Sequence, residues 1–173
     1  MDTAPITEIT EPIGPKSTIN TNTVFVIGRA YLTIAVPVLL TLLMVRLIMM
    51  PWFLEFEYNR PGFPDDIYGF TTEERLEYAP YALNYLTNDA DISYLGDLLF
   101  PNGVPQYNSR ELRHMEDVKV VTRYAFALLT FGGLFTLILC GVMFRSMAGR
   151  RELRLGLMQG SVLTLGIIGA IVV

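Results

Sequence analysis

The sequence predicts an all-α membrane protein with three transmembrane helices. An extracytoplasmic loop of about 65 residues, partly helical, is expected between the first helix and the second. Three apolar runs support this fold class, at 24–50, 120–144 and 155–173. Each run is close to the roughly 20 residues that a helix needs to cross hydrocarbon. The composition agrees, because 51% of the 173 residues are apolar and the mean hydropathy is +0.39.

The first element is a polar stretch, residues 1–23, that has neither the short basic region nor the cleavage site of a signal peptide. We therefore expect a polar cytoplasmic tail at 1–23 and an uncleaved transmembrane helix at 24–53. This helix should end near Pro51, which loosens the helical hydrogen bonds, and Trp52 suits the interfacial aromatic belt.

The extracytoplasmic loop domain is expected at 54–117. It opens with an irregular stretch, EFEYNRPGFPDDIYGF, rich in proline, glycine and aromatic residues. A helix should follow, because Thr71 and Glu74 have the spacing of a capping box and apolar residues then recur at helical intervals. The stretch LFPNGVPQY predicts a turn or short hairpin around Asn102 and Gly103.

Two further transmembrane helices complete the predicted fold, at 118–144 and 155–173, with a basic cytoplasmic loop at 145–154. Arg123 and Arg145 are 22 positions apart, about 33 Å along a helix, which matches the bilayer with one cation near each face. The third helix carries small residues at a spacing that favours close packing against another helix. These residues are Gly156, Gly160, Gly166 and Ala170.

The charges are distributed unevenly and predict the orientation. Residues 51–120 hold thirteen acidic and five basic side chains, whereas 145–154 holds four arginines and one glutamate. Short cytoplasmic loops collect Lys and Arg. We therefore expect the N-terminus and the basic loop inside, and the acidic loop outside.

The chain's single histidine lies in RELRHMEDVK, residues 110–119, directly before the second apolar run. On a helix, Glu111 is three positions before His114 and Asp117 three positions after it, so both carboxylates can reach the imidazole. Such an arrangement could prepare His114 as a general base. Charged residues also commonly surround a helix that emerges from a membrane, so the spacing leaves a surface role open.

The wider pattern of this segment resembles the bacterial family that includes lipoprotein intramolecular transacylase. The matching residues are Glu111, His114, Met115, Asp117, Val118 and Lys119. The stretches YNRPGF, YGFTTEE and LNYL are also similar to the outer loop of that family, so the resemblance extends over roughly residues 25–170.

The resemblance implies a reaction that moves an acyl chain from the glyceryl group of a lipoprotein's N-terminal cysteine to the amine of that cysteine. A base must deprotonate the ammonium, and donors must stabilise the tetrahedral oxyanion. In such a reaction His114 would be the base, oriented by Glu111 or Asp117. The implied charge-stabilising or lipid-binding residues are Arg46, Lys119 and Arg123.

Two functional hypotheses remain open, so the sequence leaves open whether the protein is an enzyme. Members of such a family generally have four membrane helices, and this sequence predicts three, with a small-residue face on the third. That favours a non-catalytic accessory subunit packed in a larger membrane complex, for example a respiratory or photosynthetic one. The alternative is a lipoprotein intramolecular transacylase that works through His114.

Both hypotheses lead to the same expectations for partners and location. We expect a bacterial cytoplasmic membrane protein that contacts membrane lipids, and either other membrane subunits or lipoprotein N-termini. Nucleic acid is not expected, because the long loop is acidic. The apolar runs hold no Asp, Glu, Lys or His, and Cys140 is the only cysteine, so we predict no cofactor and no metal site.

Overall fold

A computed structural model describes residues 21–172 and confirms the predicted fold class. It is all-helical, and three of its helices are long and apolar enough to cross a membrane. The tail expected at 1–23 lies, up to residue 20, outside the described residues, as does Val173. The described residues form six helices, α1 (Thr21–Ile48), α2 (Pro51–Tyr58), α3 (Thr72–Thr87), α4 (Ser93–Gly96), α5 (Ser109–Phe144) and α6 (Met147–Val172).

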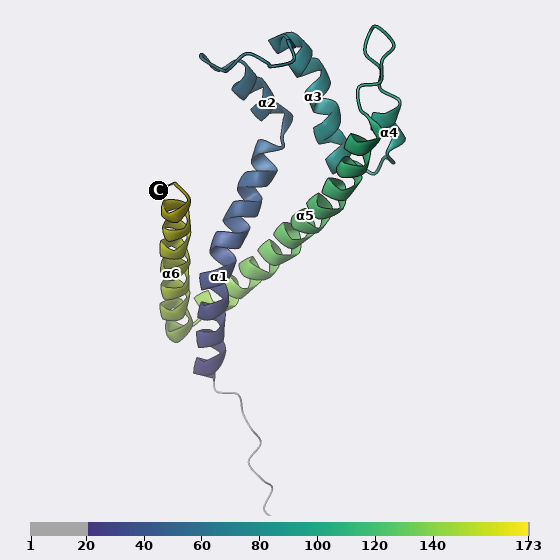
Figure 1. The fold of residues 1–173 in the computed structure, drawn as a ribbon. Helices are drawn as coiled ribbons and strands as arrows, with labels where there is room; N and C mark the ends of the chain where they lie inside the picture. The colour runs from purple at the N-terminus through teal and green to yellow at the C-terminus, as the bar shows by residue number, and fades with distance from the viewer. Residues whose placement is uncertain (1–20, 173) are drawn as a thin grey trace, which may run out of the picture.

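The three long helices meet at one end and separate toward the other (Figure 1). Helix α6 runs beside α1, and α5 crosses α1 near the turn that joins α5 to α6. Away from that crossing α5 diverges from α1, and the helices α2, α3 and α4 lie at the far end. We call residues 49–108, which contain these three short helices, the connecting region.

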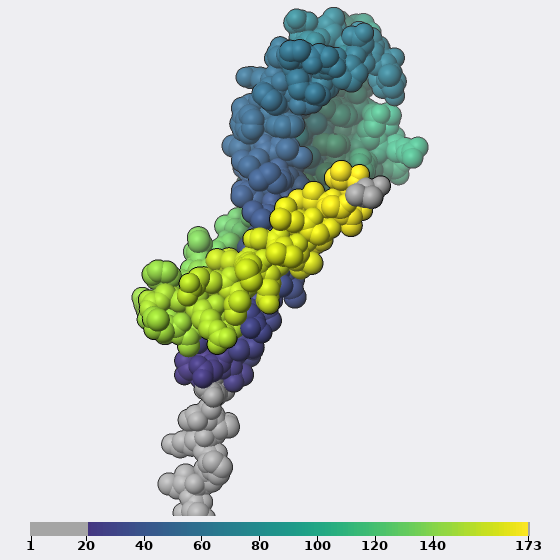
Figure 2. Space-filling view, turned by 90° about the vertical axis from the view of Figure 1, so that its left-hand side faces the viewer, coloured from purple at the N-terminus to yellow at the C-terminus, as the bar shows by residue number. Residues whose placement is uncertain are grey.

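The closest packing in the fold is between α1 and α6, and glycines make it possible. A Cβ atom on Gly156 would lie 3.0 Å from Cβ of Leu32, and one on Gly160 would lie 2.7 Å from Cβ of Val36. The contact also holds an ion pair, because Nη1 of Arg29 lies 3.0 Å from Oε2 of Glu152. Figure 2 shows the face on which α6 covers α1.

The other two small residues of α6, Gly166 and Ala170, do not pack against α1. A Cβ atom on Gly166 would meet nothing within 4 Å, and Ala170 is exposed. The spacing that predicted helix packing therefore corresponds to a contact within the described residues at Gly156 and Gly160, but not at Gly166 and Ala170. The reason is helical register, because Gly166 lies six residues after Gly160 and therefore about 120° away around the helix. Further along α6, the residues that line a pocket with α1 are Thr164, Ile167 and Ile168.

Helix boundaries differ from the expected ones where a local signal ends or starts a helix. The helix expected at 24–53 is divided, because Pro51 begins α2 and its ring cannot continue the hydrogen bonds of α1. The helix expected at 118–144 begins earlier, at Ser109, because Asn108 caps it. The stretch expected as a basic loop at 145–154 is helical from Met147 onward.

The connecting region has its own small core, which rests on α5. Tyr85, Leu86 and Leu95 are buried there, and Leu112, Met115 and Val118 of α5 pack against them. The capping box predicted at the start of α3 is confirmed, with Oγ1 of Thr71 accepting from the N–H of Glu74 and Oε2 of Glu74 accepting from the N–H of Thr71. The turn predicted around Gly103 is present, and that glycine has a φ of +80°.

We expect Gly160→Leu to lower the midpoint of thermal unfolding in detergent, because the new side chain has no room against Val36. Overpacking of this kind costs about 1–3 kcal/mol. Gly166→Leu is the matched control on the same helix, since that position is open. Equal midpoints for the two variants would contradict the α1–α6 contact.

Candidate functional site

The histidine segment forms the first turns of α5. Oδ1 of Asn108 accepts from the backbone N–H of Arg110 at 2.9 Å and of Glu111 at 3.0 Å. In return, Oε2 of Glu111 accepts from the N–H of Asn108 at 2.8 Å. This reciprocal capping satisfies helix donors that would otherwise lack partners, so it fixes where α5 begins.

The capping box changes the expected environment of the imidazole. The carboxylate of Glu111 is engaged at the helix terminus, and no hydrogen bond or ion pair joins His114 to Glu111 or Asp117 in residues 21–172. His114 is exposed instead and lines a shallow depression with Asn108, Arg110 and Glu111. Since Arg110 precedes His114 by four positions, its guanidinium and the imidazole lie on the same side of the helix.

One side of α5 is covered by the connecting region. Leu112, Met115 and Val118 recur at helical spacing and pack against the core of the connecting region. His114 is exposed at the edge of this covered side, because Val118 lies four positions after it. The depression thus lies at the edge of the face by which α5 is anchored to the connecting region.

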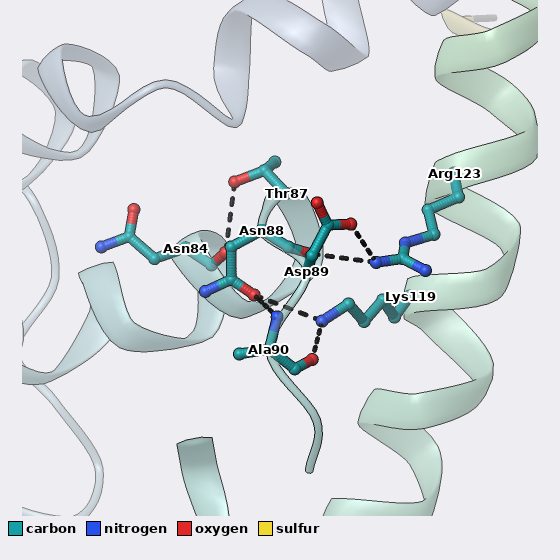
Figure 3. Close-up of polar contacts among 7 residues, drawn as sticks. All are labelled: Asn84, Thr87, Asn88, Asp89, Ala90, Lys119 and Arg123. Atoms are coloured by element: carbon teal, nitrogen blue, oxygen red, sulfur yellow. Dashed lines mark hydrogen bonds and ion pairs between the residues drawn. The ribbon is translucent and has the colours of Figure 1, made fainter. Parts of the chain in front are cut away.

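Lys119 supplies that anchor, and it is a buried cation rather than a free one. Its side chain is 6% exposed. Nζ donates to the carbonyl of Ala90 and to Oδ1 of Asn88, the latter at 3.3 Å, and it lies 3.8 Å from the centroid of the Tyr85 ring. Figure 3 shows the two hydrogen bonds from Lys119 to Asn88 and Ala90, in the segment after α3. Lys119 therefore joins α5 to the connecting region.

Arg123, one turn further along α5, also binds the segment that follows α3. Its Nη2 donates to Oδ1 of Asp89 at 2.8 Å and to the carbonyl of Asn88 at 3.1 Å (Figure 3). Asp91 follows directly, and its pKa lies below the ordinary value because the hydroxyl and the backbone N–H of Ser93 both donate to its carboxylate. The positive charge of Lys119 adds to this effect. The segment 88–91 is thus held by two cations.

Arg46, the third cation proposed from the sequence, lies elsewhere. It is near the end of α1, partly buried, with its guanidinium 4.8 Å from the centroid of the Phe126 ring of α5. Phe126 is twelve residues after His114, about 18 Å along the helix. The structure therefore does not bring Arg46, Lys119 and Arg123 together around the imidazole.

The structure adds a feature that the sequence interpretation missed, an aromatic pocket in the connecting region. Tyr58, Phe70, Tyr78 and Phe100 line it together with Arg75. Arg75 is largely buried and donates to the carbonyls of Phe70 and Pro64 at 3.3 and 3.1 Å. Aromatic residues distributed over 58–107 gave the only signal, and spacing does not reveal which of them meet. Across residues 21–172, no group of three His, Cys, Asp or Glu side chains is placed to hold a metal ion.

Comparison with known proteins identifies similar sequences. A family model described as lipoprotein intramolecular transacylase Lit matches residues 30–173. An uncharacterized protein of Aquifex aeolicus (strain VF5) is 32% identical over 101 residues, which are 55% of this chain and 47% of that protein. The chain thus spans about half the length of the relative it matches. No solved structure matches.

We expect Lys119→Met to destabilise the protein, because the carbonyl of Ala90 and the side chain of Asn88 would lose their donor in a buried place. The loss should be about 1–3 kcal/mol in the free energy of unfolding. Arg113→Met, at an exposed position on the same helix, is the control. Chemical denaturation in detergent measures both. A free energy of unfolding that is unchanged in Lys119→Met would show that the contacts of Lys119 with Ala90 and Asn88 do not stabilise the protein.

Proposed function

This chain belongs to the lipoprotein intramolecular transacylase family, and from that premise we propose that it transfers an acyl chain within a lipoprotein substrate. The chain would move from the glyceryl group of the N-terminal cysteine to the amine of the same cysteine. The family match over residues 30–173 is the observation that carries this proposal. It favours the enzyme over the accessory-subunit hypothesis, for which the described residues offer no support.

We assign the role of base to His114. The imidazole accepts a proton from the cysteine ammonium and passes it to water. The resulting amine then attacks the carbonyl carbon of the glyceryl ester, and the imidazole accepts the second proton from the attacking nitrogen. When the tetrahedral intermediate collapses, the ester C–O bond breaks and the glyceryl oxygen takes the proton back from the imidazolium. One imidazole therefore serves both steps, and the products are an N-acyl cysteine and a free glyceryl hydroxyl.

The exposure of His114 and its lack of a protein partner support this assignment, because the imidazole is accessible to a substrate amine. Arg110 is the donor best placed to stabilise the oxyanion, since it lines the same depression. Arg123 and Lys119 suit this role less, because the connecting region already occupies their donors. Glu111 acts as the helix cap that fixes the position of the first turns.

The proposal also places the protein in the membrane. Three helices serve as spans, and the connecting region with the first turns of α5 lies on the extracytoplasmic side, where lipoprotein N-termini are modified. The arginine-rich start of α6 then lies on the cytoplasmic side, as short basic segments do.

His114→Ala should reduce formation of the N-acyl product by about 100-fold or more, which is the lower range for loss of a general base. The acyl forms of a diacylglyceryl lipopeptide, separated by mass spectrometry, give the measurement. Glu116→Ala is the control, because Glu116 is exposed nearby and does not line the depression. Unchanged products from His114→Ala would eliminate this mechanism.

Arg110→Gln should lower the turnover number about 10-fold with little effect on KM, because a donor to an oxyanion acts mainly in the transition state. Arg113→Gln removes a neighbouring exposed arginine outside the depression and should leave the turnover number unchanged. A similar loss in both variants would show that general positive charge, rather than Arg110, is what matters.

A further inference from the structure

We propose that a groove between α1 and the middle of α5 binds one acyl chain of a bilayer phospholipid, whose phosphate is held by Arg46. The groove is apolar and lies within two candidate membrane spans. Its walls are Ile34, Ala35, Val38 and Leu39 of α1 and Leu128 and Gly132 of α5. This lipid site is separate from the depression that contains His114.

Tyr31 also lines the groove, at the crossing of α1 and α5. Its hydroxyl lies 2.9 Å from Oγ1 of Thr136, and its ring meets the Phe135 ring edge-on at 5.2 Å between centroids. These contacts fix the crossing of α1 and α5. Beyond them the two helices diverge toward the connecting region (Figure 1).

On the α5 side, Gly132 leaves space in the groove because it has no side chain. A Cβ atom there would lie 3.4 Å from Cδ2 of Leu39, so a larger side chain would enter the space between the helices. At the next residue, Gly133, a Cβ atom would meet nothing within 4 Å. The two adjacent glycines therefore distinguish the groove from the free surface of α5.

Arg46 lies beyond the upper end of this groove, eight residues after Val38 and thus about 12 Å further along α1. The Phe126 ring holds its guanidinium, and within the described residues Arg46 forms no ion pair. It lies two residues before the end of α1 and six before Trp52, an interfacial residue type. A guanidinium at that height, without a protein carboxylate, complements the phosphate of a lipid whose chain fills the apolar groove.

A phospholipid fits this position better than the proposed lipoprotein substrate. The diacylglyceryl group of a lipoprotein carries esters but no phosphate, and its reacting ester must come within reach of His114. Along α5, His114 is about 18 Å from Phe126, against which Arg46 packs. A headgroup on Arg46 is therefore away from the proposed base, and the site does not depend on the transacylase reaction.

Native mass spectrometry of the full chain in detergent tests the proposal, with palmitoyl-oleoyl-phosphatidylglycerol as the probe. We expect one lipid bound per chain, with dioleoylglycerol, which lacks the phosphate, binding at least tenfold more weakly. Arg46→Gln should weaken phosphatidylglycerol binding about tenfold, as expected when a charge-assisted contact is lost. Gly132→Leu should weaken it similarly, and the matched control Gly133→Leu should not.

Val38→Phe is a second variant that fills the groove, for use if Gly132→Leu does not give a monodisperse protein. Phosphatidylglycerol binding to Arg46→Gln at wild-type affinity would overturn the proposal, as would wild-type binding by a folded groove-filling variant. Displacement of phosphatidylglycerol by a diacylglyceryl lipopeptide, sensitive to both Arg46 and Gly132, would also overturn it, because the groove would then belong to the substrate. Each of these results is independent of whether the chain shows transacylase activity.

Discussion

The buried ammonium of Lys119 sets the relation between the connecting region and the membrane helices. A lysine amine removed from water needs acceptors, and it finds them in the carbonyl of Ala90 and the side chain of Asn88. Arg123 adds a second attachment to the same segment. Because the segment follows α3 directly, these contacts determine which face of α5 the connecting region covers. The exposure of His114 at the edge of the covered face is a consequence of this attachment.

A second constraint acts at the other end of the molecule, where glycines bring α6 onto α1 and the Arg29–Glu152 ion pair lies in the contact. Within a membrane there is little hydrophobic driving force between helices, so close backbone approach and polar contacts matter more than apolar area. Helix α1 is thus held by α6 along one side and by α5 near Tyr31, with a further contact where Arg46 lies over the Phe126 ring. The separation of α1 from α5 beyond that crossing follows directly.

Five of the Lys and Arg side chains fall into two groups, those that stabilise the fold and those that ligands can reach. Arg29, Lys119 and Arg123 have protein acceptors, and they serve the fold. Arg46 and Arg110 are placed against an aromatic ring and in an open depression respectively, where ligands can reach them. The proposed chemistry therefore rests on Arg110 and His114 alone, while Arg46 suits a lipid at a different height.

The sequence by itself determined the three spans, because the length of an apolar run is set by the thickness of hydrocarbon and requires no knowledge of neighbours. It also determined the capping box at Thr71 and the turn at Gly103, which depend on residues close in the chain. The family motif around His114 could be recognised for the same reason, because its residues are also close together in the chain. The cap that Glu111 provides at Asn108 is equally local, although the sequence interpretation did not identify it. Only the tertiary structure decided that Lys119 is buried under Tyr85 and that Arg123 pairs with Asp89. Those outcomes depend on which groups meet across long separations, such as Lys119 with Ala90, and the periodicity of a single helix does not specify its partner.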